Sequence, residues 1–425
     1  MPTMWSRRPE MRHAMPKNTA TEDATAEEVR RIIAQGDLHT VFQPIVDLET
    51  RSTVAFEALS RGPVGSVAEM PDTLFEVAAR VGLTGELDQA CVAASLSAAQ
   101  RAGIVEPLSL FVNVEAEALS LFADLLPLNL VVVVEITERD LLDDLGMLLR
   151  SAARLRSAGL KIAMDDVGSN PASLALLPLL QPDIIKLDMS LLQKQPSRHT
   201  ARVMDAVSTY QEEFGAVVIA EGVETERHVV QARALGATLG QGWLFGRPSA
   251  LVAIEAPPGV QVGPSTAAVQ DEATPFTVAE RSRAPKSSSK PLLIQASKFL
   301  EERALDGDRS TVVLSTFQLD SNFTDAMRAK YTALALHTSL VAVFVQEAAN
   351  GMTLTTGVDR LELRSFPVAD PLESEWSVIV LSATYAAMLT ARELSGADNA
   401  RNFEFVLTHN RDLVTRGALS LAVRL

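Results

Sequence analysis

The chain has 425 residues, 47% of them hydrophobic and 21% charged, a size and composition that favour two domains, or three small ones, over a single core. A formal net charge of −15 without a basic stripe argues against nucleic acid as a partner, and no apolar run reaches the length of a membrane span. The single cysteine, Cys91, rules out a disulfide framework within the chain and fits a cytoplasmic location.

Residues 1–22 carry basic side chains without an apolar stretch behind them, and we expect a disordered tail there. From Leu38 to Pro248 short β-type runs alternate with helical patterns, which is typical of βα units around a parallel sheet. Strands are predicted at Thr40–Val46, Thr53–Leu59, Ser109–Val114, Leu130–Ile136, Leu160–Met164, Ile184–Leu187, Val217–Ala220 and Leu239–Phe245. Helices are predicted at Glu86–Ala102, Arg139–Ala158, His199–Glu213 and Glu224–Leu235.

This alternation predicts an α/β fold, a TIM-like (β/α)8 barrel over residues 23–255. Asp47–Ser52 is too short for a parallel crossover, so the first two strands should form an antiparallel hairpin.

Residues 256–291 are rich in Pro, Ser, Ala and Gly and predict a linker. Residues 292–425 predict a second, smaller α/β domain. Its strands are expected at Ser310–Phe317, Ser339–Gln346, Arg360–Arg364 and Trp376–Leu381, and its helices at Asp325–His337 and Ala383–Leu394.

Almost every predicted barrel strand ends in an acidic or amide residue. In chain order these strand ends carry Glu57, Asn113, Glu135, Asp165 with Asp166, Lys186, Glu221 and Gln241. Because the carboxyl ends of barrel strands meet at one mouth, the side chains should converge there. A single such carboxylate is more often a helix cap or loop hydrogen-bonder, and Lys186 alone could pair with neighbouring acids. Capping does not explain so many successive strand ends.

Crowded carboxylates raise one another's pKa unless cations compensate them. An oxygen-rich set without His or Cys favours Mg²⁺ or Mn²⁺ over zinc, and two such ions could polarise a phosphoryl group and generate hydroxide from water. The strand ends therefore predict a two-metal site that cuts a phosphodiester.

Glu57-Ala58-Leu59-Ser60-Arg61 resembles the EAL-x-R motif of the EAL-type cyclic di-GMP phosphodiesterases. The rest of that family's pattern follows in order over Leu38–Pro248. The matching motifs are Gln43-Pro44-Ile45, Val112-Asn113, Glu135-Ile136-Thr137-Glu138, Asp165-Asp166, Ile185-Lys186-Leu187-Asp188, Ala220-Glu221-Gly222-Val223-Glu224-Thr225 and Gln241-Gly242-Trp243-Leu244-Phe245.

The resemblance implies hydrolysis of cyclic di-GMP to linear pGpG, with one metal on Glu57, Asn113, Glu135 and Asp165 and a second on Asp165 and Asp166. Glu221 would support the metal ligands through water. Lys186 would position or deprotonate the attacking water, with Gln241 beside it. The other roles are substrate binding by Gln43, Leu59, Arg61 and Asp188, and stabilisation of the active-site loop by Glu138.

The loop after the metal aspartates departs from the family pattern. Val167–Ser173 lacks the usual Phe, second Gly and Tyr, and Pro171 stiffens it. Since every metal-binding position is kept, we favour an active enzyme. The alternatives are a receptor that binds cyclic di-GMP without cutting it, and a barrel enzyme that acts on another phosphodiester.

The second domain carries fewer chemical signals. His337 and His409 are isolated, and Asp359, Glu362 and Glu373 lie in polar stretches that predict solvated loops. The stretches Ser315–Phe323 and Pro367–Trp376, with the predicted helix Ala383–Glu393, resemble the DICT sensory domain. This resemblance implies a sensor of an unknown ligand or protein partner that regulates the barrel, and a passive dimerisation domain is the alternative. We expect a homodimer.

Overall fold

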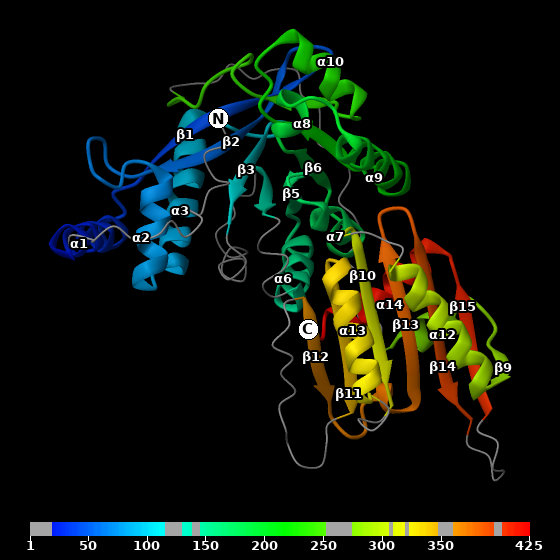
Figure 1. The fold of residues 1–425 in the computed structure, drawn as a ribbon. Coiled ribbons are helices and arrows are strands. Elements are labelled where there is room, and N and C mark those ends of the chain that lie inside the picture. Colours follow the sequence, from blue (N-terminus) through cyan, green and yellow to red (C-terminus); the bar gives the residue numbers. More distant parts are fainter. Residues whose placement is uncertain are drawn as a thin grey trace. The chain divides into compact units, whose positions relative to one another are not determined.

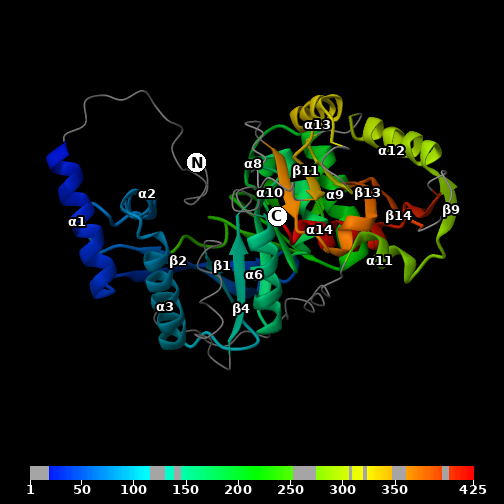
Figure 2. The same ribbon diagram turned by 90° about the horizontal axis from the view of Figure 1, so that it is seen from below.

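The computed structural model describes residues 19–114, 130–137, 145–251, 274–305, 309–318, 323–346, 360–394 and 402–425. Its contacts divide the chain into two compact units. The first takes its described residues from 1–140, 151–169 and 182–267, and the second from 141–150, 170–181 and 268–425. Figures 1 and 2 show the ribbon from two directions.

The first unit is built around a closed barrel of eight strands in sequential order. They are β1 (His39–Asp47), β2 (Thr53–Arg61), β3 (Ser109–Asn113), β4 (Val131–Ile136), β5 (Lys161–Val167), β6 (Ile184–Leu187), β7 (Val217–Ala220) and β8 (Leu239–Gln241). β1 runs antiparallel to both β2 and β8, while the other neighbours pair in parallel. The predicted barrel with one antiparallel strand is confirmed.

One helix precedes the first strand, and the others lie between successive strands along the chain (Figure 1). They are α1 (Thr19–Gln35), α2 (Pro71–Val81), α3 (Thr84–Ala102), α6 (Leu145–Ser157), α7 (Pro171–Leu180), α8 (Ser190–Gln193), α9 (Arg198–Phe214) and α10 (Glu226–Ala234). Among the described residues, none of the helices combines the length and apolar character needed to cross a membrane.

β8 is shorter than predicted because the chain turns at Gly242. A Cβ at Gly242 would lie 2.2 Å from the carbonyl oxygen of Val223 and 2.3 Å from its nitrogen. Only glycine allows so close an approach between two backbone segments. The strand therefore ends at Gln241, and the apolar residues after it belong to a turn.

Each barrel strand contributes an apolar side chain to a buried layer. The layer consists of Ile45, Ala55, Phe111, Val133, Ala163, Ile184, Ile219 and Leu239. Val54, next to Ala55 on β2, belongs to the same buried cluster. Because strand side chains alternate between faces, the residue two positions further toward the mouth points to the same side. Those residues are the predicted strand-end set apart from Asp166, with Gln43 on the oppositely directed β1. The layer is thus a dry floor beneath the mouth.

The second unit contains a seven-stranded sheet in the order β12-β11-β10-β13-β14-β15-β9. The strands are β9 (Lys286–Ser289), β10 (Thr311–Phe317), β11 (Leu340–Gln346), β12 (Leu361–Phe366), β13 (Glu375–Ser382), β14 (Ala386–Glu393) and β15 (Asn402–Thr408). β10, β11 and β12 are parallel, and the remaining pairs are antiparallel.

Helices cover both faces of this sheet. They are α11 (Pro275–Glu280), α12 (Lys290–Leu305), α13 (Asp325–His337), the short 3-10 helix Pro371–Ser374, and α14 (Arg411–Ala422). α12 and α13 share a buried cluster with β10, β11 and β13, whereas α11 and α14 pack together and against β14. The second, smaller α/β domain is therefore confirmed.

Two expectations for this part of the chain were wrong. Ala383–Leu394 was predicted as a helix but forms β14, since a tight turn at Ser382 reverses the chain after β13 and both faces of β14 are covered. Its alanine-rich composition favours a helix, and tertiary pairing overrides that preference. In addition, residues 274–291, expected in the linker, form α11, β9 and the start of α12.

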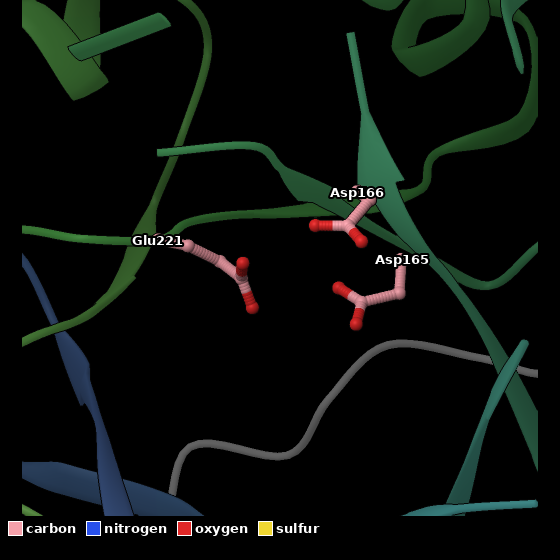
Figure 3. Close-up of side chains that lie close together, drawn as sticks. All are labelled: Asp165, Asp166 and Glu221. Carbon is pink, nitrogen blue, oxygen red and sulfur yellow. The ribbon is translucent and has the colours of Figure 1, made fainter. Parts of the chain in front are cut away.

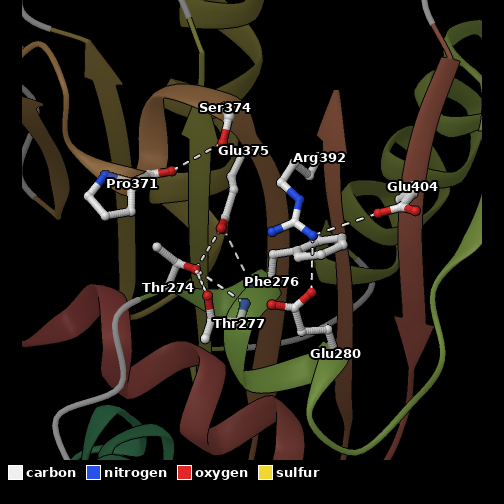
Figure 4. A network of polar contacts seen from close by, with 9 residues as sticks. All are labelled: Thr274, Phe276, Thr277, Glu280, Pro371, Ser374, Glu375, Arg392 and Glu404. Carbon is white, nitrogen blue, oxygen red and sulfur yellow. Dashed lines mark hydrogen bonds and ion pairs between the residues drawn. The ribbon is translucent and has the colours of Figure 1, made fainter. Parts of the chain in front are cut away.

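A buried carboxylate fastens α11 to the sheet (Figure 4). Glu375, the first residue of β13, is 3% exposed and accepts hydrogen bonds from the Thr274 hydroxyl at 2.6 Å and the Phe276 amide at 3.2 Å. Arg392, opposite it on β14, lies over the Phe276 ring and donates to Glu280 at 3.0 Å. Burial raises the pKa of Glu375 to about 7, despite these donors and the charge of Arg392.

This shift predicts how the stability of the second unit depends on pH. The folded state binds a proton on Glu375 more tightly than the unfolded chain, whose carboxyl has the ordinary value of 4.5. The contribution of Glu375 to the free energy of unfolding is therefore lost as pH rises from about 4.5 through about 7. The total loss is on the order of 3 kcal/mol. Glu375→Gln should remove this loss. In urea unfolding, the free energy of unfolding of the variant should therefore increase relative to that of the parent chain as pH rises.

Glu362→Gln on β12 is the matched control, because Glu362 pairs with Arg364 at 2.9 Å on a partly exposed face. It should keep the pH dependence of the parent chain. A parallel pH dependence in Glu375→Gln and the parent would contradict the assignment.

Candidate metal centre at the mouth of the barrel

The structure brings the predicted strand-end side chains together. β3 and β8 end at Asn113 and Gln241, and β4, β5 and β6 end one or two residues after Glu135, Asp165 and Lys186. Glu221 directly follows β7. Glu57 lies in the middle of β2, because this strand continues to Arg61. Neighbouring members share register, since Asn113 lies opposite Glu135 and Gln43 opposite Glu57. The ring residues, as we call Glu57, Asn113, Glu135, Asp165, Lys186, Glu221 and Gln241, thus form the layer directly above the apolar floor.

Lys186 lies among the carboxylates of the ring. Its Nζ is 2.6 Å from Glu135, 2.8 Å from Glu221, 3.2 Å from Asp165 and 3.9 Å from Glu57, and its side chain is fully buried. The ring acids, from sequence-distant strands, are therefore its ion-pair partners. In the absence of metal ions, the ammonium group of Lys186 compensates the negative charge of the ring carboxylates.

Asp183 and Asp188, the acidic residues nearest to Lys186 in sequence, make other hydrogen bonds. The Asp183 carboxylate accepts a hydrogen bond from the Ile162 amide at 2.9 Å, which ties β5 to the chain before β6. Asp188 accepts from the Ser190 amide at 3.0 Å and so stabilises the turn into α8. These two carboxylates therefore have the role of a helix cap or loop hydrogen-bonder that is common for a single acidic residue at a strand end.

Amide side chains surround Glu57. Its carboxylate accepts hydrogen bonds from Asn113 Nδ2 at 3.1 Å and from Gln241 Nε2, and Gln241 also donates to Gln43 Oε1 at 3.1 Å. For Asn113 to bind a metal, its amide must turn so that Oδ1 replaces Nδ2, two positions of nearly equal shape. The network links β1, β2, β3 and β8 around one carboxylate.

Burial and charge move the pKa values of the ring in opposite directions. Burial alone would raise the pKa of Glu57, but Lys186 and the amide donors outweigh it and lower that pKa. Burial raises the pKa of Asp165, and it raises those of Glu135 and Glu221 further with help from neighbouring carboxylates. The same carboxylates raise the pKa of Lys186 against its burial. The ring therefore holds a charged lysine and an excess of carboxylates that favours more cations.

The donor set fits divalent metal ions. Oxygens of Asp165, Asp166 and Glu221 lie within 4.8 Å of one another, and Figure 3 shows the two aspartates facing Glu221. Within the described part of the chain, Oε2 of Glu135 and Oε2 of Glu221 are buried without a hydrogen-bond donor. Unsatisfied buried carboxylate oxygens are costly unless a cation takes them. All-oxygen ligation suits Mg²⁺ or Mn²⁺.

The remaining predicted site residues are placed as follows. Leu59 and Arg61 follow Glu57 on the same face of β2, and both are buried. Arg61 donates to the Ser60 carbonyl at 2.8 Å. Glu138 lies outside the described residues. The geometry does not test the individual roles assigned to these residues, and they stay predictions.

Sequence reasoning missed the apolar floor. Its signal is present as a hydrophobic residue two positions before each ring residue, for example Ala163 before Asp165 and Ile184 before Lys186. A period of two along successive strands would have located it.

Comparison with known proteins gives two family matches. Residues 26–248 match the model of the EAL domain, and residues 271–394 match that of the sensory domain in diguanylate cyclases and two-component systems. Both are the families that the motifs predicted, and that prediction is confirmed.

Two curated proteins and one solved structure illustrate the similarity. The cyclic di-GMP phosphodiesterase RocR of Pseudomonas aeruginosa is 28% identical over 52% of this chain and 60% of its own length. An uncharacterized protein of Mycobacterium tuberculosis is 33% identical over 52% of this chain and 38% of its own. The BlrP1 manganese and cyclic di-GMP complex of Klebsiella pneumoniae is 26% identical, with a TM-score of 0.44, over 50% of this chain and 56% of that one. The chain thus spans less than two thirds of the length of these proteins.

The ring predicts a strong stability effect at Lys186. Lys186→Met removes the ammonium group and leaves the buried carboxylates without a compensating charge. In the absence of metal ions, this should lower the free energy of unfolding by about 3–5 kcal/mol. Chemical denaturation of the full chain measures this. Lys194→Met, at an exposed lysine just after α8, is the control and should change stability little. Equal stability of both variants would show that Lys186 does not compensate the ring.

Proposed function

The chain belongs to the EAL domain family, and from that membership and the geometry of the barrel mouth we propose that it hydrolyses cyclic di-GMP to linear pGpG with divalent metal ions. The convergence of the ring residues on one buried point carries this proposal. RocR, which is similar to 52% of this chain, is a cyclic di-GMP phosphodiesterase, which supports the same substrate here.

We assign two ions, Mg²⁺ or Mn²⁺, to the ring. Glu57, Asn113, Glu135 and Asp165 would hold one, and Asp165 and Asp166 the other. Glu221 would support these ligands through water. Bound there, the ions would polarise the phosphoryl group and favour hydroxide formation from water. The buried oxygens of Glu135 and Glu221 that lack a donor support this assignment.

The protein side chains supply positioning. Lys186 would position or deprotonate the attacking water, because its Nζ lies 2.6 Å from Glu135 and 2.8 Å from Glu221, beside the proposed ions. Gln241 holds Glu57 in place through its amide. Arg61 is the proposed phosphate contact, and its positive charge matters because a doubly anionic substrate must approach an acidic ring.

Gln43, Leu59 and Asp188 complete the proposed substrate contacts. Gln43 and Leu59 lie on the two strands of the antiparallel hairpin, and Gln43 is joined to Gln241 by a hydrogen bond. Asp188 lies just past the end of β6, two residues after Lys186. These positions extend from the ring along β1, β2 and β6.

The departure of the Val167–Ser173 loop from the family pattern favours one competing function. A receptor would bind cyclic di-GMP at the same mouth without cutting it and would signal through protein contacts. Both proposals use the same ring and differ in whether the loop allows turnover.

We further propose that the second unit regulates the barrel. Its match to a sensory domain family supports this role over passive dimerisation, and its ligand or protein partner is left open. A homodimer and a cytoplasmic location complete the proposal. The family resemblance supports the first, and a single buried cysteine supports the second.

Incubation of the purified chain with cyclic di-GMP and Mn²⁺ tests the main proposal. We expect pGpG, and we expect Glu57→Gln to reduce the rate by at least about 100-fold because it removes a ligand and the centre of an amide network. Glu76→Gln, at an exposed carboxylate on α2, should keep the parent rate. Tight binding of cyclic di-GMP without product would support the receptor instead, and faster cleavage of a different dinucleotide would reassign the substrate.

Regulation can be tested with a variant far from the ring in sequence. Glu375→Gln alters the attachment of α11, the first described element after residue 251, without touching any ring residue. If the second unit controls the barrel, the hydrolysis rate of the full chain should change by at least about fivefold. An unchanged rate would favour the passive domain.

A further inference from the structure

The backbone that carries the two metal aspartates has an unusual shape. Asp166 has a φ of 56°, in the left-handed region, and the pairing of β5 with β6 shifts register between Met164 and Val167. Residues with a Cβ are uncommon in that region, and aspartate is among the few that enter it, as a single residue. The bend turns two successive carboxylates toward the mouth, so surrounding contacts must hold it.

Contacts from the residue after β6 and from α8 and α9 hold the residues after the bend. The carbonyl of Val167 accepts a hydrogen bond from the Asp188 amide at 3.1 Å, and the Val167 side chain is fully buried. Gly168 has a φ of 95°, and a Cβ there would lie 2.8 Å from Leu191 Cδ1 and 3.2 Å from Val203 Cγ2. α8 and α9 therefore pack directly on the backbone of the loop.

His199 adds a polar contact from α9. Its Nε2 lies 2.7 Å from the carbonyl oxygen of Gly168. Because a carbonyl only accepts, Nε2 must carry the hydrogen. His199 precedes Val203 by four residues, so both lie on one face of α9 and both meet Gly168.

The start of α9 is itself fixed. Ser197 accepts a hydrogen bond from the Thr200 amide at 3.3 Å, and the Thr200 hydroxyl accepts one from the Ser197 amide at 3.1 Å. This capping box sets the first turn of the helix, which contains His199. The imidazole is therefore presented to Gly168 from a rigid base.

We propose that His199 is a positioning residue of the metal centre, which holds the Gly168 carbonyl and thereby the bend that aims Asp165 and Asp166 at the ions. The proposal rests on the metal site proposed above. It explains how a loop without the family's usual Phe, second Gly and Tyr keeps its shape, since the contact uses a backbone atom that any sequence provides.

The test uses the full chain without nucleotide. His199→Ala should weaken Mn²⁺ binding, measured by calorimetry, by about 10–100-fold, as loss of a group supporting metal ligands usually does. Amide hydrogen exchange over Val167–Ser169 should become faster in the metal-free variant. His199→Gln, whose side-chain Nε2 can donate from nearly the same place, should restore most of the affinity and the protection.

Gln211→Ala is the matched control on the same helix. The Gln211 amide also donates to backbone carbonyls, those of Ala216 at 3.4 Å and Gly236 at 3.2 Å, which precede β7 and β8 at the opposite end of the barrel. It should leave Mn²⁺ affinity and loop exchange unchanged. Parent-like affinity and exchange in His199→Ala, or equal weakening in Gln211→Ala, would overturn the proposal.

The two readouts separate this proposal from the proposed function. Mn²⁺ affinity and exchange are measured without cyclic di-GMP, so they hold whether or not the chain cuts it. If the parent chain binds no Mn²⁺, the metal assignment fails, and faster exchange over Val167–Ser169 in His199→Ala alone still decides the role of His199 in the bend.

Discussion

The enclosure of the Lys186 ammonium by four buried carboxylates is the interaction on which the barrel mouth depends. Moving an ion out of water costs several kcal/mol, and attraction offsets that cost only when partners are close and well placed. Here the partners come from β2, β4, β5 and the end of β7. The cluster can exist only when the strand registers are correct, so folding of the barrel and assembly of the site are one event.

The apolar floor makes this arrangement possible. It seals the barrel below the ring with one side chain from each strand, which keeps water away from the charges above it. In such surroundings charge interactions are stronger than in water, which favours the pairing of Lys186 and also raises the pKa of Glu135 and Glu221. The two-residue period of a strand thus links a layer that stabilises the fold to a layer that can hold cations.

The sequence was informative where strands are buried and end in polar residues. β6 and β7 have the predicted bounds, because each is a short buried run that is rich in β-branched residues and is followed directly by an acidic residue. β14 was mistaken for a helix because Ala386–Ala391 favours helix locally, and its pairing with β13 and β15 depends on distant residues. α11 was missed because Glu375, about a hundred residues later, supplies the contacts that hold its start.

The same distinction explains why the Val167–Ser173 loop was the hardest part of the site to interpret. A sequence comparison considers only which side chains are present, and this loop lacks the Phe, the second Gly and the Tyr of the family pattern. The structure shows that the bend is held through the carbonyls of Val167 and Gly168 by groups on later elements. Those contacts use backbone atoms, which all residues have, so changes at Ser169–Pro171 leave the contacts in place. The shape of the bend then depends on Gly168 and on the residues that face it. Divergence of the loop and retention of the ring are therefore physically compatible.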